Sequence, residues 1–478
     1  MNKKEDKKYT IGMIGLGTMG CNLLLNIADH GFSGAGYDKN PDKVSMLDQL
    51  GRGKNVKGFT DLNHFIQNLE APRALMMLVP AGKIVDDVIA DLIPLLDKGD
   101  ILIDGGNSHF TDTERRSIAL EKMGFHFFGM GISGGEEGAR NGPSMMPGGH
   151  KEAYKHVQHI FEAIAAKVND EPCVTYIGPG ASGHFVKMVH NGIEYALMQL
   201  IAETYEILKK GLRLDNDAVH KIFDQWNKGR LQSFLLEITA EIFSFENADS
   251  GHLLLDDIRD EAKSKGTGKW TSQVAMDLNL PIPVIDIAVS MRDLSKYKIL
   301  RMEAAGIYDD MPRKALTEKP EEYLTMLEEA YYFSMVTVYA QGMHLLYKAS
   351  ETYNYKLELD QVAKIWRGGC IIRSSFLEDI YTAFRANEKL EHLFLDGSVR
   401  SIHKNSLQDI RTVVADAASY GLSVPAYAAS LNYFDAFRSE RMPSNLIQAQ
   451  RDFFGTHGYE LIGRDGVFHS EWNNKVKT

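Results

Sequence analysis

The sequence has few cysteines and no long apolar run. Its three cysteines, Cys21, Cys173 and Cys370, are odd in number and far apart, which excludes a disulfide framework or cysteine metal site and favours a reducing compartment. No apolar stretch approaches the roughly 18 residues that span a membrane. The charged N-terminus MNKKEDKKY leads into a short strand, not into the apolar stretch of a signal peptide. The sequence therefore predicts a cytoplasmic protein without a membrane segment.

Positive charge is also scarce. The 53 Lys and Arg residues are outnumbered by 64 Asp and Glu residues, which gives a net charge of −11. Such a balance argues against non-specific binding to nucleic acid or to a membrane surface. Any anionic ligand must therefore be bound by local basic clusters.

The length and composition predict a multidomain globular protein. A chain of 478 residues with 44% hydrophobic residues is too long for a single core, so two or three domains are expected. The patterns described below predict an α/β Rossmann-type domain over residues 1–181, a large all-helical domain over 182–440, and a C-terminal tail over 441–478.

The N-terminal segment carries a dinucleotide-binding pattern. A short apolar strand, Thr10–Ile14, runs directly into a GxGxxG turn and a helical segment, and a second strand, Gly34–Tyr37, ends at Asp38 about 20 residues on. In this pattern the first glycine allows a tight turn, the second lets the backbone approach a pyrophosphate, and the third allows close helix–strand packing. The helix N-terminus then faces the phosphates. The predicted cofactor-binding residues of the turn are Gly15, Leu16, Gly17, Thr18, Met19 and Gly20.

Asp38 bears on the choice of coenzyme. A carboxylate at the end of the second strand accepts hydrogen bonds from the ribose hydroxyls and repels a 2′-phosphate. The residue type therefore favours NAD over NADP, although Lys39 can offset part of the repulsion. Asp38, Lys39 and Asn40 are predicted to bind this part of the coenzyme.

Later strands of the first domain end in loops that are candidates for ligand contact. Strands are expected at Ala74–Val79, Ile101–Asp104, His126–Ile132 and Cys173–Gly178, and ligands of such sheets bind beyond the carboxyl ends of the strands. The turn of Val79, Pro80 and Ala81 is predicted on the nicotinamide side. Asn107 is either a ligand-binding residue or an Asx-turn residue.

Glycine-rich loops follow the His126–Ile132 strand. Ser133, Gly134 and Gly135 begin one loop, and residues 142–149 form another. Exposed backbone N–H groups in such loops suit a carboxylate or a phosphate, but the glycines have turn-making as an equal alternative.

A helix expected over Gly180–Leu208 carries the most unusual pattern. Lys187, His190, Asn191 and Glu194 stand at i, i+3, i+4 and i+7, on one stripe of a helix that is otherwise largely apolar. The stripe is therefore expected to be buried or to line a cleft. It is either a buried ion pair or a proton-transfer cluster, in which burial lowers the pKa of Lys187 and raises that of Glu194.

The second half of the sequence is helical in pattern and contains three basic spots. Amphipathic segments are expected at 215–226, 235–246, 320–349, 359–367, 375–387 and 403–420. The loop 263–271 carries Lys265 and Thr267 and could bind a phosphate. Arg292 lies in an apolar helix, where Asp293 or Asp286 is its simplest partner. The tail contains Arg451 and His457, and it has too little apolar surface to fold alone, so it must pack on its own chain or on another subunit.

Six strings in this order resemble the decarboxylating 6-phosphogluconate dehydrogenases along essentially the whole chain. They are GLGTMG, DGGNS, SGGEEGARNGPSMMPGG, GHFVKMVHNGIEY, KGTGKWT and AQRDFFGTHGYE. The resemblance implies oxidative decarboxylation of 6-phosphogluconate to ribulose 5-phosphate with NAD or NADP and no metal. It also implies a homodimer in which the tail of one subunit reaches the other.

The resemblance also implies roles for individual residues. Lys187 is implied to be the base that takes the proton of the 3-hydroxyl group, and Glu194 the acid that protonates the carbon left by CO2. The implied contacts to the sugar acid are Asn107, which also adjoins the cofactor, and Ser133, Gly134, Gly135, His190 and Asn191. The rest of the implied substrate site, chiefly around the phosphate, is Tyr195, Lys265, Thr267, Arg292 and, from the other subunit, Arg451 and His457.

Two positions depart from the habit of the family. Many members carry Asn-Arg-Thr, which binds the 2′-phosphate, where this sequence has Asp38-Lys39-Asn40, and many carry Lys where Pro80 stands. Both departures remove groups suited to NADP, so NAD use or dual specificity is expected. The alternative functions are a dehydrogenase of another β-hydroxy acid and a non-enzymatic nucleotide sensor, which would not need Lys187 and Glu194 on one helical face.

Overall fold

The computed structural model describes residues 8–264, 266–308, 316–317 and 319–472. Within these ranges none of the helices is both long enough and apolar enough to cross a membrane. The described chain divides into two compact units, of which the second begins at Leu431. The predicted domain limits of 1–181, 182–440 and 441–478 stay predictions.

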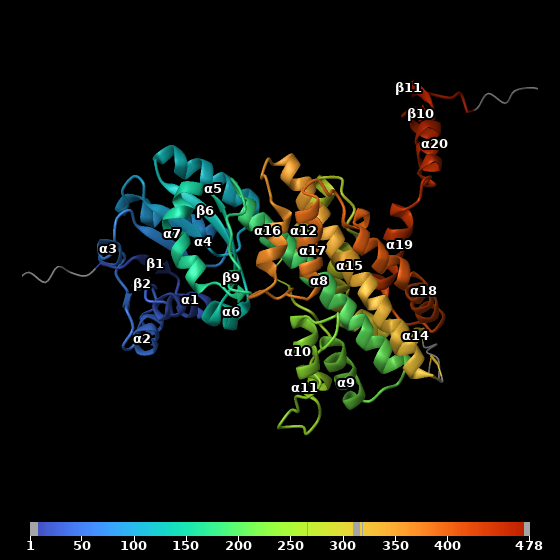
Figure 1. The fold of residues 1–478 in the computed structure, drawn as a ribbon, viewed down its shortest axis with the longest axis horizontal. Coiled ribbons are helices and arrows are strands. Elements are labelled where there is room, and N and C mark those ends of the chain that lie inside the picture. The colour runs from blue at the N-terminus through green and yellow to red at the C-terminus, as the bar shows by residue number, and fades with distance from the viewer. Residues whose placement is uncertain (1–7, 265, 309–315, 318, 473–478) are drawn as a thin grey trace, which may run out of the picture. The chain divides into compact units, whose positions relative to one another are not determined.

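The N-terminal part is a Rossmann-type sheet covered by helices on both faces (Figure 1, blue to cyan). The order β3-β2-β1-β4-β5-β6-β7 reverses direction beside β1, and all pairs except β6–β7 are parallel. The carboxyl ends of β1 and β4 therefore flank the topological switch point, where such folds bind ligands. The strands are β1 Ile11–Ile14, β2 Gly34–Tyr37, β3 Val56–Phe59, β4 Ala74–Met77, β5 Ile101–Asp104, β6 His126–Ser133 and β7 Ser144–Gly149. The helices are α1 Thr18–Asp29, α2 Pro41–Leu50, α3 Leu62–Gln67, α4 Lys83–Leu92, α5 Phe110–Met123, α6 Gly135–Asn141 and α7 Lys151–Ile164.

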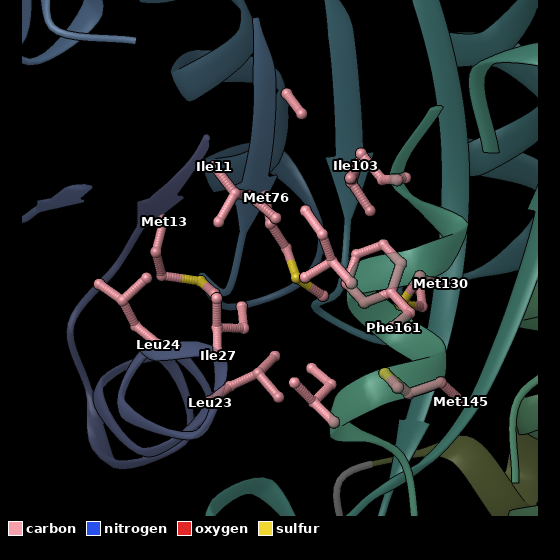
Figure 2. Close-up of a cluster of buried hydrophobic side chains, with 14 of the residues drawn as sticks. Ile11, Met13, Leu23, Leu24, Ile27, Met76, Ile103, Met130, Met145 and Phe161 are labelled. Carbon is pink, nitrogen blue, oxygen red and sulfur yellow. The ribbon is translucent and has the colours of Figure 1, made fainter. Parts of the chain in front are cut away.

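The sheet separates two hydrophobic cores because neighbouring strand residues point to opposite faces. Ile11, Met13 and Met76 pack with Leu23 of α1 and Phe161 of α7 in one core (Figure 2). Ile14, Leu75, Met77 and Leu102 pack on the other face with side chains of α3, α4 and α5. Burial on both faces explains why these short strands are nearly continuous apolar runs.

Two predictions at the edge of this sheet were wrong. Residues 144–149, expected as a glycine-rich loop, form β7, which pairs antiparallel with β6. Cys173–Gly178, expected as a strand, makes only isolated bridges to β7 at Val174 and Gly178. Pro147 of β7 has no N–H to donate, which limits a continuous ladder on that side. A two-stranded ribbon of β8 Lys167–Val168 and β9 Glu171–Pro172 stands just before this segment instead.

The remainder is helical, as predicted, and is organised around two long helices. Helix α8, Ser182–Glu206, contacts α12, α13 and α15 as well as β6 and β7 of the sheet, so it joins the two halves of the first unit. It continues into a π-helical turn, Ile207–Gly211. The other helices are α9 Asn216–Asn227, α10 Phe234–Ile242, α11 Leu254–Asp257, α12 Thr267–Asp277, α13 Pro283–Ser295, α14 Lys298–Ile307, α15 Pro320–Thr352, α16 Leu359–Trp366, α17 Phe376–Ala386, α18 Gly397–Ser419 and α19 Pro425–Phe437. Short 3-10 turns occupy Ile93–Leu95 and Leu393–Leu395.

The second unit begins with the last residues of α19 and continues with α20, Ser444–Gly455, and a hairpin of β10 Tyr459–Leu461 and β11 Arg464–Phe468. Its centre is polar. The carboxylate of Asp452, which is fully buried, accepts hydrogen bonds from the backbone N–H of Gly458, the His469 ring and the indole N–H of Trp472.

Candidate active site

Helix α8 places the predicted polar stripe together and buries most of it. Lys187 and His190 are buried, while Asn191 and Glu194 are partly exposed. Nδ1 of His190 lies 3.2 Å from Nζ of Lys187 and 3.8 Å from the Glu194 carboxylate. The expectation of a buried stripe is confirmed, and its four side chains form one connected polar cluster.

Burial changes the proton affinities in the directions expected for an acid and a base. Burial lowers the pKa of Lys187 from 10.5 to about 8, although the negative charge of Glu194 acts to raise it. Burial also raises the pKa of Glu194 above its ordinary value, and the positive charges of Lys187 and Arg292 offset only part of this rise. Burial and the nearby Lys187 also lower the pKa of His190 well below its ordinary value. At neutral pH the imidazole is therefore uncharged, and the amine loses its proton far more readily than an exposed lysine.

Close backbone packing brings the stripe to the sheet. A side chain at Gly131 of β6 would overlap the β-carbon of Lys187, and one at Gly192 of α8 would meet Thr271 of α12. Glycine at both positions lets α8 approach its neighbours closely enough to bury charged groups.

The turn after β6 faces the same cluster. The Ser133 hydroxyl lies 3.2 Å from Nε2 of His190. Gly134 and Gly135 follow with φ of 122° and 63°, a region that favours glycine. Asn107, also left-handed at φ 54°, donates to the carbonyl of Ile132 and accepts from its N–H. Asn107 is thus held beside the Ser133 turn by backbone hydrogen bonds.

A second cluster begins at Tyr195, the residue that follows Glu194 in α8. The guanidinium of Arg292 stacks 3.6 Å from the centre of the Tyr195 ring, and Gly268, in the first turn of α12 after Thr267, packs on the same ring. The simplest pairing expected for Arg292 was wrong: Asp293 pairs with Lys296, and within the described residues no carboxylate pairs with Arg292. An unpaired cation beside a helix N-terminus can bind an anion.

Three predicted substrate residues do not belong to the described part of the first unit. Lys265 lies outside the described residues. Arg451 and His457 are exposed in the second unit. Their roles stay predictions.

The predicted coenzyme turn has the geometry of its motif. Gly15 has φ 93°, and a side chain there would meet the carbonyl of Leu78 at 2.6 Å. A side chain at Gly20 would overlap the carbonyl of Gly15, whereas Gly17 has open space around it. Thr18 and Met19 begin α1, so the helix N-terminus is directed at this open backbone.

Asp38 lines a cavity of about 520 Å³ together with Gly15, Gly17, Lys39, Val79 and Pro80. Its carboxylate accepts from the N–H groups of Leu16 and Asn40 and from Lys43. Although burial raises its pKa, these hydrogen bonds lower it overall, so Asp38 is ionised. Lys39 instead pairs with Asp91. A fixed carboxylate beside open glycine backbone fits the ribose and pyrophosphate of a nicotinamide dinucleotide. Ala81 follows Pro80 on the exposed surface.

Sequence reasoning missed the loop after α16. Trp366 lies edge-on to the His190 ring, with centroids 5.5 Å apart, and the carbonyl of Gly369 closes over Gly134. Cys370 in this loop is buried, and burial raises the pKa of its thiol to about 12. The Gly-Gly-Cys run after a tryptophan was the only available signal, and it does not by itself indicate a site. In the part of the chain that is described, no group of three His, Cys, Asp or Glu side chains is arranged to hold a metal ion.

Comparison with known proteins matches both halves of the chain. Residues 10–178 match the family described as the NAD binding domain of 6-phosphogluconate dehydrogenase, and residues 183–472 match the C-terminal domain of 6-phosphogluconate dehydrogenase. An NADP(+)-dependent, decarboxylating 6-phosphogluconate dehydrogenase of Bacillus subtilis is 48% identical over 97% of this chain and 99% of its own length. The decarboxylating enzyme 2 of Saccharomyces cerevisiae is 46% identical over 95% and 92%.

The fold agrees with a solved structure. The 6-phosphogluconate dehydrogenase of Plasmodium falciparum, described in its apo form and in complexes with NADP+ and with 6-phosphogluconate, superposes with a TM-score of 0.94 at 42% identity. The superposition covers 97% of this chain and all of that one.

Proposed function

This chain belongs to the 6-phosphogluconate dehydrogenase family, and on that premise we propose that it converts 6-phospho-D-gluconate to D-ribulose 5-phosphate and CO2, with NAD or NADP as oxidant. It is thus a decarboxylating oxidoreductase of the pentose phosphate pathway. The observation that carries the proposal is the buried cluster of Lys187, His190 and Glu194 beside the Ser133 turn.

Lys187 is the proposed base. In its neutral form its Nζ takes the proton of the substrate 3-hydroxyl group, and a coenzyme held at the Gly15–Gly20 turn would supply the acceptor for the hydride of C3. The protonated amine then stabilises and reprotonates the carbonyl oxygen as the C1 carboxylate leaves as CO2. The ketone serves as the electron sink for this step, so the residues themselves supply the required charge stabilisation.

Glu194 is the proposed acid. Its raised pKa keeps a larger fraction of the carboxyl group protonated than an exposed glutamate retains at neutral pH. Its proton goes to the carbon that becomes C1 of ribulose 5-phosphate. Substrate contacts are proposed for Asn107, Ser133, Gly134, Gly135, His190 and Asn191, and phosphate-side contacts for Tyr195, Lys265, Thr267 and Arg292.

We further propose that the chain uses NAD, either in preference to NADP or together with it. The ionised Asp38 supports this, because it sits in the cavity where a 2′-phosphate would otherwise bind. The Bacillus relative is NADP(+)-dependent, so the proposal rests on Asp38 alone.

A homodimer with tail exchange is also proposed. It is supported by the exposed apolar side chains of the tail, such as Phe454 and Ile462, and of α14, such as Ile299. Arg451 and His457 would then complete the phosphate site of the other subunit. A cytoplasmic location is supported by the three free, buried cysteines.

The test is an assay of the purified protein with 6-phosphogluconate and each coenzyme. We expect NADH or NADPH and CO2 to appear in equal amounts. Turnover of an unphosphorylated β-hydroxy acid alone, or coenzyme binding without turnover, would replace the proposal by one of the two alternative functions.

A further inference from the structure

Arg116 of helix α5 is a buried cation that has no role in the chemistry described above. Its side chain is 2% exposed. Such a charge is costly to bury unless all of its donors are paired. The partners of Arg116 therefore indicate what it holds in place.

The guanidinium joins two segments, the start of α4 and the turn after β5, through three residues. Nε and Nη2 form a two-pronged contact with the Asp86 carboxylate at 2.9 and 3.0 Å, in the first turn of α4. Nη2 also donates to the carbonyl of Gly82 at 2.8 Å, at the end of the turn after β4. Nη1 reaches the Ser108 hydroxyl at 3.2 Å, in the turn after β5.

The turn after β5, which contains Ser108, is itself bonded to the last residue of β5. The Ser108 hydroxyl donates to the fully buried Asp104 carboxylate at 2.7 Å, and the N–H of Gly106 donates to its other oxygen. Arg116 lies 3.5 Å from the same carboxylate. One cation thus balances the charge of Asp104 and pairs with Asp86.

The two turns that Arg116 connects are in contact with each other. A side chain at Gly106 would lie 2.6 Å from the carbonyl of Val79. Val79 and Pro80 line the coenzyme cavity. Asn107, which follows Gly106 in the chain, forms hydrogen bonds with the backbone of Ile132, beside the Ser133 turn. A shift of either turn would therefore move both the coenzyme wall and the substrate side.

We propose that Arg116 is a positioning residue for hydride transfer, because its guanidinium fixes the turn at Gly82 against the turn at Ser108 and so sets the coenzyme wall at Val79 and Pro80 relative to the Ser133 turn. The inference rests on the proposed function. A lysine cannot replace the arginine, since a single ammonium group does not reach Asp86, Gly82 and Ser108 in one planar arrangement.

The test compares Arg116→Lys with Arg115→Lys. Arg115 is the matched control because it bonds to the same Asp86 but is 57% exposed. Hydrogen exchange of backbone amides should accelerate in peptides covering 79–86 and 104–108 of Arg116→Lys and stay unchanged at 15–20. kcat with 6-phosphogluconate should fall about 10- to 100-fold. The dissociation constant of ADP-ribose should stay within about twofold, because Asp38 and the Gly15–Gly20 turn would hold it and neither is among the residues bonded to Arg116. Arg115→Lys should match the wild type throughout.

Two results would overturn the inference. One is a kcat of Arg116→Lys within about twofold of the wild type. The other is an equal loss of ADP-ribose affinity, which would indicate a general structural role. Should Arg116→Lys fail to fold, Ser108→Ala removes the hydroxyl that bonds to both Arg116 and Asp104 but keeps the Arg116 contacts with Asp86 and Gly82. It should give the same pattern with a smaller loss of kcat; a normal kcat would refute the proposal. Failure of the proposed function is distinguishable, since the wild type would then not turn over 6-phosphogluconate while the exchange and ADP-ribose results would still be measurable.

Discussion

Nζ of Lys187 lies 3.2 Å from Nδ1 of His190, one turn further along helix α8, and both side chains are buried. Because burial keeps the imidazole neutral, Nδ1 can accept a hydrogen bond from the amine. Its Nε2 then carries the proton and can donate to the Ser133 hydroxyl. His190 thereby connects the proposed base to the turn proposed to bind the substrate.

Lys187→Ala should lower kcat by about 10²- to 10⁴-fold, the usual contribution of general acid–base catalysis. Binding of NAD or NADP should not change, since the amine is not part of the coenzyme cavity. Titration calorimetry with the coenzyme and steady-state rates with 6-phosphogluconate measure the two effects. Lys210→Ala, which removes an exposed amine just beyond the same helix, is the control. A near-normal kcat for Lys187→Ala would contradict the assigned role.

The pH profile should show the titration of Lys187. The amine acts as a base only when neutral, so kcat/KM should rise with pH through an apparent pKa of about 8. The charge of Glu194 raises this pKa, and Glu194→Gln should therefore move the rising limb to lower pH while lowering the rate. A rising limb that stays in place in Glu194→Gln would argue against coupling of the two groups.

Burial of Lys187 should also lower the free energy of unfolding at neutral pH. Its pKa is lowered in the folded state, so the folded protein binds fewer protons than the unfolded chain between about pH 8 and 10.5, and stability rises with pH across that window. The shift corresponds to about 3 kcal/mol below pH 8. Lys187→Met should therefore raise the free energy of unfolding at pH 7 by up to about 3 kcal/mol, and this advantage should shrink toward pH 10. Thermal unfolding at both pH values tests this, and a lower Tm of Lys187→Met at pH 7 would refute it.

Asp38→Asn should shift the ratio of kcat/KM for NADP over NAD upward by about tenfold, which corresponds to removing one repulsion of about 1.4 kcal/mol from the 2′-phosphate. The two ratios are measured under identical salt conditions. Asp42→Asn is the control, because Asp42 is exposed in the first turn of α2 and does not line the cavity. A strong preference of the wild type for NADP would defeat the prediction.

Asp452→Asn should weaken the hydrogen bonds that hold helix α20 to the residues that follow it in the second unit. The buried carboxylate accepts from Gly458, His469 and Trp472, and an amide cannot satisfy all of these donors. Fluorescence of the four tryptophans should change because the environment of Trp472 changes, and KM for 6-phosphogluconate should rise if Arg451 contributes from another subunit. Asp465→Asn, on the exposed strand β11, should show neither effect. An unchanged spectrum would mean that Asp452 does not organise this unit.

Much of the fold and of the candidate site could be predicted because the signals were local. The GxGxxG turn, the ends of most strands and the spacing of Lys187 to Glu194 each lie within one element and follow its period. β7 was missed because its pairing with β6 depends on a neighbour and not on its own Pro- and Gly-rich residues. The error at Cys173–Gly178 has the same origin, since an apolar run forms a strand only where a partner can supply hydrogen bonds.

The amino-acid order by itself determined that four polar groups share one helical edge, that a carboxylate ends the second strand, and that basic residues cluster at three places. Only the tertiary structure decided that Gly131 admits Lys187 to the sheet, that Trp366 covers His190, and that Arg116 connects two turns more than twenty residues apart in the chain. The physical reason is that periodicity reports which side chains share a face. Burial and the resulting pKa shifts depend on which distant backbone packs against that face.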